Sequence, residues 1–260
     1  MKRKSLGTCV LLLGLLLGTS SSAYADALSI TSMTLSNFQV VPTSGTIMFF
    51  LPRNQALARA TNSLNQESLQ IVVTESLTTA QASANVTFAS ASAVADPVNS
   101  SGSQNSNATL SGCNCEAFAV GQTVLQQSFI ITGGTGNVDV LFSGLLVMSQ
   151  TLLTDEFGLV AGSNVLVGIH LGSSSIFPTI FSTLTIGPNG SLVSNIEQQL
   201  SQILTLQFNT EYRFDLTLSA NSRVVNQAPG EIPEPATVVL LVSGLASMAG
   251  FVRKGLVSRR

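Results

Sequence analysis

The sequence contains no tryptophan, one histidine and three cysteines, and charged residues make up only 9% of its 260 positions. A single histidine excludes any metal site built on two histidines, and no His-Glu-x-x-His pattern is present. The two tyrosines are too few for a cleft that stacks sugar rings on aromatic side chains, and one of them, Tyr24, lies next to the start of the predicted mature chain. These absences argue against a metalloenzyme and against a lectin or sugar hydrolase.

The few charges are distributed unevenly. Seven of the eleven basic residues lie in the first four and the last eight positions. Between residues 26 and 231, four arginines stand against twelve carboxylates, a formal charge of −8, and there is no lysine. Binding of nucleic acid rests on Lys and Arg that neutralise phosphates, so we expect no nucleic-acid partner. An acidic, well-solvated surface is the prediction for this stretch.

The first 25 residues have the organisation of a secretory signal peptide. A basic start is followed by an apolar run from Leu6 to Gly18, and Ala23-Tyr24-Ala25 precedes Asp26. The small side chains of Ala23 and Ala25 suit signal peptidase, so we expect the mature chain to begin at Asp26. Cys9 lies inside the apolar run, which disfavours lipoprotein processing.

The C-terminal residues form a second tripartite segment. Residues 228–235 are a Pro-rich linker, Ala236–Val252 carries no charge, and residues 253–260 are a basic tail. At 1.5 Å per residue the apolar run spans about 25 Å, slightly less than a hydrocarbon core of about 30 Å. We predict a marginal transmembrane helix with the basic tail in the cytoplasm, and an unprocessed single-pass anchor is the alternative to a removable one.

Pro233, Glu234 and Pro235, with the apolar span and basic end that follow, resemble a PEP-CTERM sorting signal. The resemblance implies that an exosortase cleaves near this motif after export through the inner membrane of a Gram-negative-type bacterium. It further implies that the remainder is released or joined to an outer-surface component, in a setting of exopolysaccharide and biofilm production. It covers about 28 residues and implies nothing about residues 26–227.

Residues 26–227 are predicted to be a mainly β ectodomain, an antiparallel β-sandwich or jelly-roll-like fold. Period-2 alternation is clearest in Glu211–Ser219 and in Asn137–Gly144, where alternate residues are apolar. The Gly-rich segment between Thr132 and Asn137 is typical of a hairpin turn. Further strands are expected at Leu28–Leu35, Thr46–Leu51, Leu69–Thr74, Asn85–Ala91, Val124–Thr132, Asn164–Leu171, Thr179–Ile186 and Leu204–Asn209.

Three segments depart from this pattern. Ser191–Gln202 and Arg53–Leu64 place apolar residues at helical spacing and are predicted to be helices. Residues 95–112 are rich in Ser, Asn and Gly and contain no aromatic residue. Such a composition buries little apolar surface, so a long mobile loop is predicted there.

The residues that could carry chemistry do not form a recognised grouping. His170 lies in a strand-like run without a nucleophile motif, so a structural role is favoured. Asp139, Asp155 and Glu156 could serve a carboxylate-dependent hydrolase or contribute to calcium binding, although no EF-hand pattern is present. We therefore predict no enzyme activity, no cofactor and no metal site.

Cys113 and Cys115 are the only cysteines of the predicted mature chain. Export to an oxidising compartment favours a disulfide between them. Zinc would require four ligands, and intermolecular pairing is the alternative.

The sequence as a whole predicts an exported structural or binding protein of the cell surface or extracellular matrix, associated with exopolysaccharide. A secreted carboxylate-dependent hydrolase and an adhesin that binds calcium or ice are the alternatives.

Overall fold

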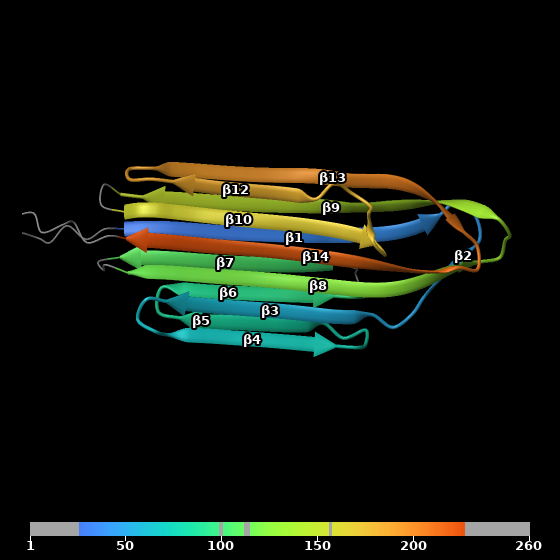
Figure 1. The fold of residues 1–260 in the computed structure, drawn as a ribbon, viewed down its shortest axis with the longest axis horizontal. Coiled ribbons are helices and arrows are strands. Elements are labelled where there is room, and N and C mark those ends of the chain that lie inside the picture. Colours follow the sequence, from blue (N-terminus) through green and yellow to red (C-terminus); the bar gives the residue numbers. More distant parts are fainter. Residues whose placement is uncertain (1–25, 99–100, 112–114, 156–157, 227–260) are drawn as a thin grey trace, which may run out of the picture. The chain divides into compact units, whose positions relative to one another are not determined.

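The computed structural model describes residues 26–98, 101–111, 115–155 and 158–226. This part of the chain consists of antiparallel strands and contains no helix (Figure 1), which confirms the predicted mainly β class. The strands are β1 (Asp26–Pro42), β2 (Thr46–Phe49), β3 (Arg53–Asn62), β4 (Glu67–Thr74), β5 (Ala80–Val86), β6 (Ala89–Asp96), β7 (Ser101–Ser111), β8 (Glu116–Thr132), β9 (Asn137–Thr154), β10 (Gly158–Leu171), β11 (Ser174–Ser175), β12 (Ile180–Ile186), β13 (Ser191–Gln207) and β14 (Glu211–Asn226).

The strands form two sheets, and every pairing between strands is antiparallel. The six-stranded sheet has the order β13-β9-β1-β7-β6-β5. The eight-stranded sheet has the order β11-β10-β14-β8-β3-β4, with β12 paired to β10 and β2 paired to β8. In Figure 1 the strands of both sheets lie along one common axis, with their arrows pointing in alternate directions. The two inward faces enclose the buried side chains.

The alternation seen in the sequence corresponds to inward and outward faces. Phe214, Leu216 and Leu218 of β14 are buried, as the period-2 pattern predicts. Val138 and Val140 of β9 are buried in the same way. Successive strand residues point to opposite sides of a sheet, so a strand with one apolar face packs that face inward. The strands predicted at these two segments are confirmed.

The core between the sheets has two regions of different composition. One contains large side chains, with Phe129 surrounded by Phe49, Phe142, Tyr212 and Phe214 at ring-centroid distances of 5.8–6.4 Å. The other is built mainly of alanine: Ala27, Ala56, Ala58, Ala60, Ala80, Ala82, Ala84, Ala89, Ala91, Ala93, Ala95, Ala108, Ala117, Ala119 and Ala161. Small side chains allow the facing backbones to approach one another closely in this region.

A glycine shows how close this approach is. A Cβ atom added to Gly121 of β8 would lie 2.7 Å from the carbonyl oxygen of Ser92 on β6, in the opposite sheet. It would also lie 3.1 Å from Cβ of Gln104 on β7. No side chain fits between the sheets at this position.

Both predicted helices are wrong, because the segments form strands β13 and β3. Leu192, Ile196 and Leu200 are four residues apart, a spacing that places them on one face of a helix but also on one face of a strand. In β3, Ala56, Ala58 and Ala60 are buried at strict period 2. Alanine is only weakly hydrophobic, so a buried face made of alanines is hard to recognise from the sequence.

The predicted mobile loop at 95–112 is also wrong. Ser101–Ser111 forms β7, which lies between β1 and β6. Four of its five inward residues are small or polar, namely Gly102, Gln104, Ser106 and Ala108, and the fifth is Leu110. Gln104 donates a hydrogen bond from Nε2 to the carbonyl oxygen of Leu218 at 3.1 Å. The segment is a strand because its inward face packs against the opposite sheet, and one large apolar side chain, Leu110, is buried there.

Two turns differ from their predictions. The segment Asn85–Ala91, predicted to be one strand, contains the β5–β6 hairpin, in which Phe88 adopts a φ of 76°. The Gly-rich segment between β8 and β9 is a turn, with Gly133 at a φ of 89° and Gly136 at 76°. It does not form a hairpin, since β8 and β9 belong to different sheets.

Candidate functional site

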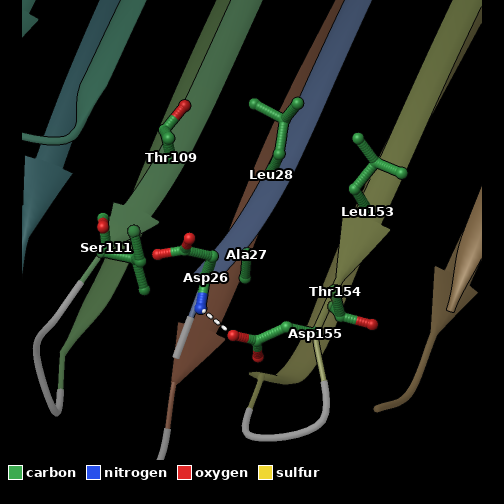
Figure 2. Close-up of a pocket in the computed structure, with 9 residues that line it drawn as sticks. Asp26, Ala27, Leu28, Thr109, Ser111, Leu153, Thr154 and Asp155 are labelled. Carbon is green, nitrogen blue, oxygen red and sulfur yellow. Dashed lines mark hydrogen bonds between the residues drawn. The ribbon is translucent and has the colours of Figure 1, made fainter. Parts of the chain in front are cut away.

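The candidate site is a pocket at the end of the domain where β1 begins and where β7 and β9 end. It has a volume of about 410 Å³. The lining residues are Asp26, Ala27, Leu28, Thr109, Leu110, Ser111, Leu153, Thr154 and Asp155. Figure 2 shows these residues near the ends of three adjacent strands, β7, β1 and β9.

The centre of the site is a pair of hydrogen bonds between the start of β1 and the end of β9. The backbone N–H of Asp26 donates to Oδ2 of Asp155 at 2.8 Å, drawn as a dashed line in Figure 2. The backbone N–H of Asp155 donates to the carbonyl oxygen of Asp26 at 3.0 Å. The two residues therefore hold the ends of the two strands together.

The turn after β12 makes hydrogen bonds to the last residue of β9 and to Asp155. The N–H of Asn189 donates to the carbonyl oxygen of Asp155 at 2.8 Å. The Thr154 hydroxyl donates to the carbonyl oxygen of Gly187, and it accepts from the N–H of Gly190 at 3.0 Å. These contacts hold the backbone of Thr154 and Asp155, and the Asp26 N–H binds the Asp155 carboxylate.

The pocket surface is mostly apolar, and its polar groups are carboxylates, which accept hydrogen bonds, and hydroxyls, which both donate and accept. Asp26 and Asp155 contribute carboxylates and Thr109, Ser111 and Thr154 contribute hydroxyls, around a wall formed by leucines. Carboxylate oxygens accept hydrogen bonds and attract cationic groups. The two carboxylates favour a cationic nitrogen donor near the start of β1.

The three carboxylates considered for a hydrolase are not brought together. Asp139 lies near the start of β9 and accepts a hydrogen bond from the Thr205 hydroxyl at 2.7 Å. Asp155 directly follows the end of the same strand. At about 3.4 Å per residue, Asp139 and Asp155 are some 50 Å apart. Glu156 lies outside the described residues. Asp139 and Asp155 cannot act on one bond of a substrate.

His170 has neighbours that the sequence did not predict. The antiparallel register places it opposite Asp215 on β14 and opposite Ser175 on β11. The other contacts of these two residues lie elsewhere, because Asp215 pairs with Arg213 at 3.1 Å and the Ser175 hydroxyl donates to the carbonyl oxygen of Phe177. His170, Asp215 and Ser175 are neighbours only because their strands pair, so no local sequence motif could have predicted this arrangement.

The remaining predicted site residues lie mostly outside the described part of the chain. Cys115 is buried and disulfide-bonded, whereas Cys113 lies outside the described residues, so the pairing of these two stays a prediction. Ala23, Ala25, Pro233, Glu234 and Pro235 also lie outside them, as does the predicted span at Ala236–Val252.

Within the described ranges there is no group of three or more His, Cys, Asp or Glu side chains placed to hold a metal ion. The same ranges contain no helix of the length and hydrophobicity needed to cross a membrane.

No protein-family model matches this chain, and no curated protein matches it.

Proposed function

We propose that this chain is an exported structural or binding protein of the cell surface or extracellular matrix. Signal peptidase cleaves before Asp26, and an exosortase cleaves near Pro233, Glu234 and Pro235. The product is an acidic β-sandwich that associates with exopolysaccharide or an outer-surface component. It has no catalytic role in this proposal.

One observation carries the proposal: the backbone nitrogen of Asp26 lies 2.8 Å from the carboxylate of Asp155. Cleavage before Asp26 would turn this nitrogen into an α-ammonium group. The hydrogen bond would then become an ion pair, which strengthens a contact of this geometry. The first described strand begins at Asp26, which is compatible with cleavage before this residue, and the Asp155 carboxylate suits an α-ammonium group there.

The C-terminal boundary supports the same proposal. Strand β14 ends at Asn226, whose N–H donates to the carbonyl oxygen of Cys115 at 3.0 Å. In Figure 1, β1 begins and β14 ends at the same end of the two sheets. Cleavage at both proposed positions would leave every strand of the two sheets intact.

Mass spectrometry of the protein from its own host tests the proposal. In cells with the exosortase, we expect an N-terminus at Asp26 and a C-terminus near Pro233–Pro235. Cells without the exosortase should retain Arg260. Glu234→Ala should also retain Arg260, while Glu231→Ala, a matched carboxylate just outside the motif, should be processed normally.

An intact Arg260 in wild-type cells would contradict exosortase processing. An N-terminus at Met1 would contradict export by the signal peptide.

A further inference from the structure

The free edge of β13 is the longest unpaired strand edge that the described residues present. β13 is the terminal strand of the six-stranded sheet, and it pairs with β9 on one side only. Seventeen residues form it. An edge of this length exposes a row of backbone donors and acceptors that can pair with another strand.

The direction of these backbone groups follows from two bonds at the ends of the strand. The carbonyl oxygen of Gly190 accepts from the N–H of Thr154, and the N–H of Phe208 donates to the carbonyl oxygen of Gly136. The backbone N–H and C=O groups of the even-numbered residues of β13 therefore point toward β9. Successive residues alternate in direction, and the groups facing away belong to Ser191, Val193, Asn195, Glu197, Gln199, Ser201, Ile203, Thr205 and Gln207. Two side chains of the described residues reach this row. The Gln207 N–H donates to the Tyr212 hydroxyl at 2.8 Å, and Nε2 of Gln202 donates to the Ile203 carbonyl oxygen at 3.4 Å.

The opposite edge of the same sheet is covered. The N–H of Ser83 on β5 donates to Oε1 of Gln70 at 2.6 Å, and the N–H of Thr87 donates to Oε1 of Gln66 at 3.2 Å. Side chains from β4 and the turn before it thus occupy donors at that edge. Among the described residues, no side chain from another strand binds the outward backbone groups of the central residues of β13.

The side chains of β13 also lack the usual protection against pairing. Natural edge strands carry lysine, proline or inward-pointing charges that block association. β13 contains no proline and no basic residue, and Glu197 is its only charged residue. Val193 is 58% exposed and Ile203 is 60% exposed, so apolar side chains on this strand lack cover within the monomer.

We propose that the β13 edge binds the same edge of a second copy of this chain, in antiparallel register centred on Gln199. In this register each residue whose backbone groups point away from β9 stands opposite another such residue of the second copy, so these groups can pair. Glu197 stands opposite Ser201 of the second copy, and Val193 opposite Thr205. Like charges directly opposite one another destabilise a strand pair, and this arrangement separates the two glutamates.

A pairing of this kind is isologous and closes as a two-fold dimer. The two six-stranded sheets become one continuous sheet across the interface. The proposal does not depend on export or processing, because it concerns the described domain alone.

Cysteine cross-linking of the purified full-length chain tests the register. At Gln199 the two copies place their Cα atoms about 5.5 Å apart, within the range of a disulfide. On oxidation, Gln199→Cys should give at least about tenfold more covalent dimer than wild type, which carries the same native cysteines. Asn195→Cys is the matched control, since its two copies are about 27 Å apart along the ladder.

A charge pair tests the same register without cysteine. Ser201→Glu places a carboxylate opposite Glu197 and should raise the dimer Kd, whereas Ser201→Lys should lower it, each by about two- to tenfold for two symmetric contacts. Sedimentation equilibrium measures both constants, and melting temperatures near that of wild type show that the variants are folded.

A wild-type chain that sediments as a monomer at every concentration overturns the dimer. So does cross-linking of Gln199→Cys that does not exceed that of Asn195→Cys. Equal shifts of Kd in the two Ser201 variants overturn the register. None of these results bears on N-terminal or C-terminal processing, which mass spectrometry reads separately.

Discussion

At the scale of single residues, the buried side chains include a hydroxyl network that crosses between the sheets. The Ser222 hydroxyl on β14 lies 3.0 Å from the Thr31 hydroxyl on β1 and 3.0 Å from the Ser106 hydroxyl on β7. It also bonds the carbonyl oxygen of Ser106 at 2.9 Å. All three side chains are fully buried, so each depends on the others in place of water.

We expect Ser222→Ala to lower the free energy of unfolding by about 1–3 kcal/mol, since the Ser106 hydroxyl loses its partner in a dry environment. Ser219→Ala, on the outer face of the same strand, should change it by no more than about 0.5 kcal/mol. Urea denaturation measures both values. Equal effects of the two substitutions would contradict a role for the buried network.

At the scale of strands, β7 illustrates how a polar sequence becomes a central strand. Its residues pair with β1 on one side and with β6 on the other. Asn107, for example, stands opposite Ile30 and Ser90. A central strand uses the backbone N–H of every residue, whereas a mobile loop uses few of them.

Asn107→Pro should therefore lower the free energy of unfolding by about 3 kcal/mol or more, because proline removes a ladder donor inside a sheet. Asn107→Ala keeps the N–H and should cost less than about 1 kcal/mol. Far-UV circular dichroism during urea titration compares the two variants. Proline tolerated as well as alanine would indicate that this segment is a loop.

At the scale of the whole domain, the separation of the two sheets depends on side-chain size. Large residues such as Phe129 and Phe142 fill one core region, while alanine and glycine fill the other. The ion pairs of Arg59, Arg213 and Arg223 are exposed on the surface, and exposed pairs of this kind contribute little. Packing of the two inward faces is the main source of stability.

Gly121→Ala tests this close packing. The added methyl group would meet the Ser92 carbonyl oxygen at 2.7 Å, so the sheets must move apart and the free energy of unfolding should fall by about 1–3 kcal/mol. Gly162→Ala in β10 meets nothing nearer than 3.6 Å and is the matched control, expected within about 0.5 kcal/mol of wild type. A Gly121→Ala protein as stable as this control would contradict the close approach.

Local alternation was sufficient to predict several strands and their faces, as in Glu211–Ser219. It failed at Ser191–Gln202, where a four-residue spacing fits both helix and strand. It also failed at residues 101–111, where inward positions hold Gly102, Gln104 and Ser106. For the candidate site, the sequence identified Asp26 and Asp155 separately, on different grounds, and had no means of placing them 129 positions apart in contact.

The sequence by itself determined the mainly β class, the acidic character of residues 26–231 and the two terminal segments on which the export proposal rests. These depend on composition and on the order of neighbouring residues. Only the tertiary structure decided which strands share a sheet, which small polar residues are buried, and that the backbone nitrogen of Asp26 meets the carboxylate of Asp155. Such contacts join residues far apart in the chain, and their energy arises only once the two sheets face each other.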